Sequence, residues 1–171
     1  MKPDPIALDL SRILSVPSAR GAMAPVLARV EKTLSARPDQ RQAWEPIPLR
    51  SLGFATPEAV RSCWVFVLRS GAIFGPERHP NSHQRTIALS GAALFEILMD
   101  ESWSPWPVSS IPDEPGATSA ISIAPSVWHR IRVGPETFVS VSFHTAPAEE
   151  LIEETPIGDD LSTTIKRVYH A

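Results

Sequence analysis

The chain has 171 residues, with 16 Lys and Arg against 19 Asp and Glu, and a single cysteine, Cys63. This length fits one domain that buries its own core without covalent cross-links. One cysteine excludes a disulfide framework and a zinc site built from paired cysteines. The scattered basic residues exclude the charge pattern of a nucleic-acid-binding protein. Because no apolar run reaches the length of a signal peptide or a membrane span, we expect a cytoplasmic protein with no membrane partner.

Residues 1–40 form the expected N-terminal helical arm. Apolar residues recur at helical spacing between residues 5 and 36, and Pro25 suits the first turn of a second helix. We expect the arm to pack on the rest of the domain or on a second subunit. A polar linker near residue 40 separates it from a second region, residues 41–171.

From Trp44 onward the pattern changes to short apolar segments rich in β-branched and aromatic residues. These segments are CWVFVLR (63–69), QRTIALS (84–90), ALFEILM (93–99), SAISIA (119–124), VWHRIRV (127–133) and TFVSVSF (137–143). Residues 99–118 hold four Pro and two Trp and are expected to form a long loop. A short helix is expected from Pro147, and the tail fits either a strand or a helix. The pattern predicts an all-β barrel or sandwich.

The residues able to bind a metal are concentrated before the second of these segments. Glu77 and His79 are two positions apart, so on extended backbone they face the same side. His129 lies on a predicted strand far away in sequence. Two imidazoles and one carboxylate facing one cavity leave positions open for water, substrate or dioxygen. This ligand set suits Fe(II), and also Mn, Ni or Zn.

The segment from Gly71 to Gly91 resembles the first motif of the cupin superfamily. That motif runs Gly, five residues, His, one residue, His, three or four residues, Glu, six residues, Gly. In this chain Glu77 occupies the position of the first His and His79 that of the second, and Gln84 occupies the position of the Glu. Every interval fits the motif, and Glu77 and Gln84 depart from it in identity.

The segment IAPSVWHRI resembles the second cupin motif, which commonly ends Pro-x-Gly-x-x-His. Ala124 and Ser126 occupy the Pro and Gly positions, and His129 occupies the ligand position. Val133 stands where the motif has Asn. The resemblance covers about residues 44–146. It implies an antiparallel double-stranded β-helix, the cupin or jelly-roll barrel, here with an N-terminal helical arm and a short C-terminal helix.

The resemblance also implies one divalent transition metal inside the barrel, with Fe(II) favoured. The expected metal ligands are Glu77, His79 and His129, with Gln84 as a further weak ligand, and Gln84 and His83 are expected as catalytic residues that orient the substrate. The leading function is a small-molecule metalloenzyme of the Fe(II)-dependent dioxygenase type. Alternatives are a metal-dependent isomerase or epimerase, a non-enzymatic small-molecule binding or sensor cupin, and a metal-free interaction domain, because the fold alone does not give the function.

The third metal ligand stays open at this point. Strand alternation sends His83 to the face opposite Gln84. If the loop before it bends inward, however, His83 could replace Glu77 as a ligand. Glu77 would then form a salt bridge with Arg78 or Arg85 at the rim of the barrel.

The strand ending at His144 is expected to place that histidine outside the barrel. From Val139 to His144, apolar residues at odd positions alternate with Ser140, Ser142 and His144. If the apolar set faces the interior of the barrel, His144 faces outward and is structural.

The remaining expectations concern the cavity walls and the assembly. Ile87, Ile131 and Val133 are expected to line the cavity, with Trp103 or Trp106 near its mouth. A small barrel with apolar strands and a helical arm favours a homodimer formed through sheet edges or faces, with possible exchange of the arm.

Overall fold

The computed structural model describes residues 4–112 and 116–168. Its helices and strands are α1 (Pro5–Ser15), α2 (Pro17–Ser35), β1 (Gln42–Pro46), β2 (Ser62–Leu68), β3 (Ile73–Glu77), β4 (Gln84–Ser90), β5 (Ala92–Met99), β6 (Ser102–Ser109), β7 (Ala120–Ile123), β8 (His129–Val133), β9 (Phe138–His144), β10 (Ile152–Ile157) and β11 (Asp160–Val168). Short 3-10 helices lie at Leu49–Ser51 and Ala148–Glu150. Among the described residues, no helix is both long and apolar enough to cross a membrane.

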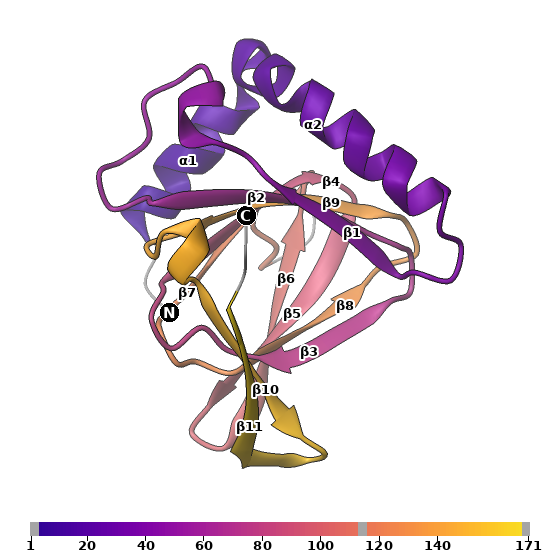
Figure 1. Ribbon diagram of the computed structural model, residues 1–171, viewed down its shortest axis with the longest axis vertical. Coiled ribbons are helices and arrows are strands. Elements are labelled where there is room, and N and C mark those ends of the chain that lie inside the picture. Colours follow the sequence, from indigo (N-terminus) through magenta and orange to yellow (C-terminus); the bar gives the residue numbers. More distant parts are fainter. Residues whose placement is uncertain (1–3, 113–115, 169–171) are drawn as a thin grey trace.

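Two antiparallel sheets form the barrel. One has the strand order β1-β2-β9-β4-β7, and the other has the order β3-β8-β5-β6. Strands β10 and β11 make a separate hairpin that projects from the end of the molecule far from the helices (Figure 1). Mostly β-structure in antiparallel sheets, with two helices at the N-terminus, is the architecture expected from the sequence.

Helices α1 and α2 cover the outer face of the five-stranded sheet, where α1 contacts β4 and β7 and α2 contacts β1 and β2 (Figure 1). Asp4 caps α1, because its carboxylate accepts a hydrogen bond from the amide of Ile6 at 2.9 Å. Pro25 does not begin a helix as expected but lies inside α2, which begins at Pro17. A proline inside a helix costs about 3 kcal/mol. Burial of apolar side chains on both sides of it, such as Met23 and Val30, offsets that cost.

In the core under the helices, the side chains of strand β9 face the opposite way from the expectation. Val139, Val141 and Phe143 pack into the cluster that includes Leu10 and Leu14 of α1. These odd-numbered residues therefore face the helices rather than the interior of the barrel. The physical reason is that the helical arm shields this outer face from water, so the face has to be apolar. The polar residues of β9 face inward instead.

A second core fills the space between the two sheets, with Phe95 and Phe138 at its centre. Part of the expected long loop, residues 99–118, belongs to this layer as strand β6, which pairs with β5 along its whole length. The sequence suggested a loop because of its prolines. Strand β6 lies at the edge of its sheet, however, and an edge strand tolerates Pro105 and Pro107 because one side of its backbone needs no partner strand.

The expected C-terminal helix is reduced to one 3-10 turn, Ala148–Glu150, after which the chain forms the β10–β11 hairpin. The like charges of Glu149, Glu150, Glu153 and Glu154 would repel one another on one side of a helix. The segment also contains Pro156 and several β-branched residues, which favour extended backbone. The hairpin turn contains a glycine with a positive φ, at residue 158.

Candidate metal centre

A bulge in strand β3 places Glu77 opposite His129 of β8. Phe74 pairs with Ile131, and the register then shifts by one residue, so that Glu77 rather than Pro76 pairs with His129. Gly75 makes this bulge possible. It has a φ of +84°, and a Cβ at its position would lie 2.8 Å from the carbonyl oxygen of His129.

Each of the two candidate histidine ligands is oriented by a backbone carbonyl. His79 Nδ1 lies 2.9 Å from the carbonyl oxygen of Ile152, and His129 Nδ1 lies 3.1 Å from that of Val127. A carbonyl oxygen only accepts hydrogen bonds, so both Nδ1 atoms carry the proton. The lone pair of each imidazole is then on Nε2. This is the arrangement by which metal-binding histidines are usually held.

The structure brings Glu77, His79 and His129 together, with one ligand atom from each within 4.8 Å of the others. His129 is fully buried, and its Nε2 has no hydrogen-bond partner among the described residues. Glu77 Oε1 lies 3.4 Å from that nitrogen. A buried, unpartnered nitrogen beside a carboxylate is costly without a further group to bind. The donor set therefore fits a divalent transition metal.

The ionisation of these groups also suits a cation. Burial lowers the pKa of His79, although the negative charge of Glu77 opposes this effect, so the imidazole is held neutral. For Glu77 burial raises the pKa, but the contact with His129 and the electrostatic interactions with His129, His79 and Arg167 outweigh burial, and the pKa is lowered. A neutral imidazole and an ionised carboxylate are the forms that bind metals.

Gln84 lies in the same cavity as Glu77. Its Nε2 donates to Thr86 Oγ1 at 3.0 Å, and Thr86 in turn is 2.8 Å from Ser142 Oγ. These contacts fix the amide. Its Oε1 is buried without a hydrogen-bond partner in the described part of the chain. This oxygen is therefore a second buried acceptor, after His129 Nε2, that has no hydrogen-bond partner among the described residues.

His144 is a member of this neighbourhood that the sequence reasoning missed. Its ring meets that of His79 edge-on, with the ring centroids 5.0 Å apart. Burial, and then the charges of His79 and His129, lower its pKa far below the usual histidine value. The signal was present in the sequence, because the apolar face of a helical arm needs an apolar sheet face beneath it. That requirement turns the polar face of β9, and with it His144, inward.

The cavity lined by Glu77 and Gln84 has a volume of about 160 Å³. Phe66, Phe74 and Ile131 form apolar parts of its wall, and Ser140 and Ser142 form polar parts. Of the three expected wall residues, Ile131 is found there. Ile87 packs under the helices and Val133 packs between the sheets. The side chain of Ile87 faces the helices, as those of Val139 and Val141 do, because β4 lies next to β9 in the same sheet.

Two charged residues of the cavity come from the C-terminal hairpin, which contributes none of the site residues expected from the sequence. Glu153 of β10 and Arg167 of β11 both line the cavity and form an ion pair at 2.9 Å. The two residues face each other in the register of the hairpin. No local signal in the sequence shows that this hairpin folds back against the end of β3.

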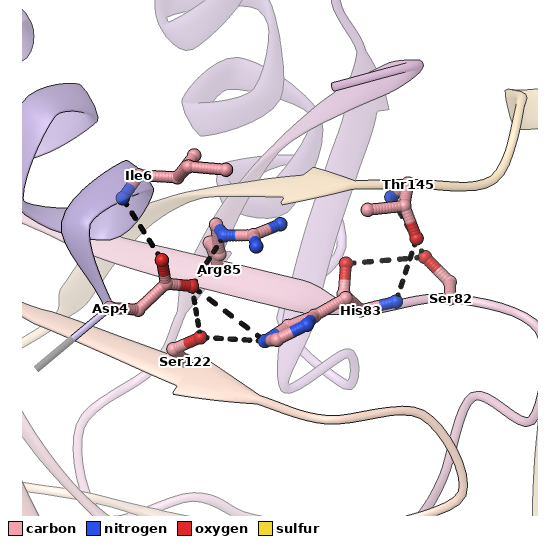
Figure 2. Close-up of polar contacts among 7 residues, drawn as sticks. All are labelled: Asp4, Ile6, Ser82, His83, Arg85, Ser122 and Thr145. Atoms are coloured by element: carbon pink, nitrogen blue, oxygen red, sulfur yellow. Dashed lines mark hydrogen bonds and ion pairs between the residues drawn. The ribbon is translucent and has the colours of Figure 1, made fainter. Parts of the chain in front are cut away.

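His83 lies outside this group, in a cluster that holds the N-terminal arm against the barrel (Figure 2). Its Nε2 is 2.7 Å from Ser122 Oγ of β7 and 3.7 Å from Asp4. Asp4 also accepts hydrogen bonds from Ser122 at 2.6 Å and from Arg85 at 2.7 Å. Burial raises the pKa of Asp4, but the bonds from Ser122, Arg85 and Ile6 outweigh burial and lower it. The expectation that His83 orients a substrate beside the metal finds no support in this placement.

The cluster of Asp4, His83 and Ser122 is not arranged for nucleophilic catalysis. Ser122 donates its single hydroxyl proton to Asp4, so His83 Nε2 must be the donor to Ser122. A histidine protonated at that nitrogen cannot take a proton from the serine. The strand alternation from the inward Gln84 to the outward His83 is the one expected from the sequence.

The tryptophans expected near the mouth of the cavity lie elsewhere. Trp103 packs against the guanidinium of Arg130, 4.4 Å from the ring centroid, and Trp106 packs against the core between the sheets. Both are held on β6, which is remote in strand order from β3. Cys63 is buried, and burial raises the pKa of its thiol, as befits an inert core residue.

No protein-family model matches this chain, and no curated protein matches it significantly by sequence. Solved structures do match it. The coconut allergen cocosin has a TM-score of 0.52 and 16% identity over 68% of this chain and 29% of its own. Procruciferin, an 11S globulin from Brassica napus, has a TM-score of 0.51 and 17% identity over 68% of this chain and 28% of its own.

The capsular polysaccharide assembling protein CapF from Staphylococcus aureus matches with a TM-score of 0.50 and 15% identity, over 78% of this chain and 33% of its own. This chain therefore spans a third or less of the length of each of these three proteins. All three have the cupin fold. At this level of identity the likeness concerns the fold alone.

Proposed function

The chain has the cupin fold, and on this premise we propose that it is a small-molecule metalloenzyme that holds one divalent transition metal, with Fe(II) favoured, inside the barrel. The proposed ligands are Glu77, His79 and His129. Two histidines and one carboxylate with open positions are the ligand set of non-haem Fe(II) oxygenases, so the proposed reaction is oxygenation of a small substrate.

One observation carries this proposal. The ligand atoms of the three residues converge within 4.8 Å, and the Nε2 of the fully buried His129 has no hydrogen-bond partner among the described residues. A structural role for His129 would leave that nitrogen unmet at a cost of about 1–3 kcal/mol. Binding to a metal removes this cost.

The residues around the proposed metal have distinct roles. Fe(II) held by this set would supply open coordination positions for substrate and dioxygen and the electrons that activate dioxygen. The carbonyl oxygens of Ile152 and Val127 hold His79 and His129 in the tautomer that presents Nε2. Gln84, whose Oε1 has no hydrogen-bond partner among the described residues, offers an acceptor to a substrate hydroxyl or a water. The apolar wall, including Phe66, limits the access of bulk water.

Element analysis of protein purified without chelators and without a histidine tag tests the metal. We expect about one transition-metal ion per chain. A His79→Ala/His129→Ala double variant should keep the circular dichroism spectrum of the parent and lose the ion. Parent protein that retains no ion after incubation with Fe(II), Mn(II), Ni(II) or Zn(II) would contradict the proposal.

Oxygen uptake separates the proposed reaction from its alternatives. Fe(II)-loaded protein should consume dioxygen when an accepted small molecule is added, and the double variant should not. Metal retention with conversion of a substrate but no oxygen uptake would indicate an isomerase or epimerase. Metal retention with ligand binding but no conversion would indicate a binding or sensor protein.

A further inference from the structure

The C-terminal hairpin is fixed to the segment that carries the proposed metal ligands. Arg78, which lies between Glu77 and His79, exchanges two backbone hydrogen bonds with Glu154 of β10, at 3.0 and 2.9 Å. The side chains of Arg78 and Glu154 form an ion pair at 2.8 Å. The carbonyl of Ile152 orients His79. The neighbouring hairpin residues therefore have a defined position relative to the ligands.

This attachment brings one cation and one anion of the hairpin to the cavity. Glu153 and Arg167 both line it, alongside Glu77. Arg167 Nη2 donates to Glu153 Oε1 at 2.9 Å. The side chain of Glu153 is 7% exposed, whereas that of Arg167 is 55% exposed, so Arg167 is the member of the pair that solutes can reach.

Counted over the described residues, the charges around the cavity leave an excess of one positive charge when the metal is bound. A divalent ion brings two positive charges and Glu77 removes one of them. Arg167 and Glu153 cancel each other. The other polar side chains of the wall, such as Gln84 and Ser142, are neutral. In a partly enclosed site with few waters, this balance favours a ligand with a single negative charge.

The size of the cavity limits the ligand further. The cavity has a volume of about 160 Å³. The pockets of drug-sized ligands start at about 300 Å³. A phosphate monoester carries roughly 1.5 to 2 negative charges at neutral pH and exceeds the single charge to be balanced. A carboxylate carries one, and its two oxygens match the planar guanidinium.

We propose that the substrate is a short monocarboxylic acid, whose carboxylate is held by Arg167 and whose carbon chain lies along Phe66, Phe74 and Ile131 toward the metal ligands. This inference rests on the proposed function, because the charge balance includes the metal. It assigns Arg167 as the residue that holds the carboxylate, in a site whose excess positive charge comes from the metal.

Isothermal titration calorimetry of the Zn(II)-loaded protein tests the assignment, since Zn(II) is redox-inactive and prevents turnover. The probes are lactate and propanoate, with lactamide and propanamide as neutral analogues of the same size. The acids should bind at least tenfold more tightly than their amides. Arg167→Gln should weaken binding of the acids about 10- to 100-fold, as expected for loss of a hydrogen bond to a charged group. It should leave binding of the amides unchanged when both proteins are loaded to the same Zn(II) content.

Lys166→Gln is the matched control, because it removes the same charge from the neighbouring residue of β11, whose side chain is exposed. It should bind the acids like the parent. Arg167→Lys keeps the charge without the planar fork and should fall between the parent and Arg167→Gln. Equal binding of acids and amides, or equal losses in Lys166→Gln and Arg167→Gln, would overturn the assignment.

The same titrations on metal-free protein separate this inference from the proposed function. If the parent takes up no metal, the proposed function fails. If the metal-free parent binds the acids and metal-free Arg167→Gln does not, Arg167 binds the carboxylate even though the proposed function fails. If the metal binds but the acids do not, only the inference about the substrate fails.

Discussion

Glu77 carries the negative charge among the three groups whose ligand atoms converge, and its side chain is 24% exposed. Glu77→Gln keeps the shape of the residue and removes the charge that offsets a divalent ion. We expect metal affinity to fall by more than the 10- to 100-fold typical of residues outside the coordination sphere. Titration of metal-free protein with Zn(II) or Mn(II), in competition with a chelator of known affinity, measures the loss.

His83→Ala is the comparison variant, because the sequence left His83 open as the third ligand. His83 contacts Ser122 and the arm, so this variant should bind metal like the parent. Gln84→Glu, which restores the common cupin residue, should tighten metal binding or leave it unchanged. The opposite pattern, with Glu77→Gln binding normally and His83→Ala losing the metal, would assign a three-histidine site.

Among the elements, strand β3 depends on the conformation of one glycine. Gly75→Ala places a Cβ 2.8 Å from the carbonyl oxygen of His129 and forces a non-glycine residue to a φ of +84°. The left-handed conformation alone costs about 1–2 kcal/mol. We expect a larger loss of unfolding free energy, measured in urea, together with weaker metal binding, because the bulge sets the register of Glu77 against His129.

Gly71→Ala separates the two contributions. Gly71 has a similar φ of +68°, but a Cβ there meets no atom within 4 Å. This variant should lose only the unfolding free energy that the left-handed backbone conformation costs, and it should bind metal like the parent. If the two variants lost equal stability, close packing of β3 on β8 would not be the reason for the glycine.

At the scale of the whole molecule, buried histidines make stability depend on pH. The pKa values of His79, His83 and His144 are all lowered, in each case first by burial. In the unfolded chain they take up protons near pH 6.5. As the pH falls below this value, the unfolded state binds more protons than the folded state, so the unfolding free energy of the metal-free protein should decrease.

The slope is at most about 1.4 kcal/mol per pH unit for each histidine, and the loss continues down to the folded-state pKa values. Asp4 and Glu77, whose pKa values are lowered, add a further loss as the pH falls below about 4. Urea unfolding at pH 7.5, 6.5 and 5.5 measures the histidine part. A stability that stays constant over this range would contradict the prediction.

Two expectations about the molecule as a whole stay predictions. They are the homodimer and the cytoplasmic location. The molar mass from light scattering at micromolar concentration tests the homodimer. The division into an arm of residues 1–40 and a barrel of residues 41–171 is likewise an expectation. In the structure the second helix ends at Ser35 and the first strand begins at Gln42.

The sequence by itself determined the features that depend on neighbouring residues. Strand β4 is the segment QRTIALS expected from its β-branched and apolar content. The intervals from Gly71 to Gly91 indicated the fold and brought Glu77 and His79 to one place, because spacing along extended backbone sets which side chains share a face.

Tertiary structure decided which face of each strand is covered and what folds back on the barrel. The periodicity of β9 is the same whichever face is inside, and only the packing of α1 and α2 on its apolar face turns His144 toward His79. Arg167 is about 90 positions from Glu77 in the chain, and the two line one cavity only because β10 pairs with Arg78. Contacts between such distant segments depend on the folding of the whole chain, and local patterns carry no information about them.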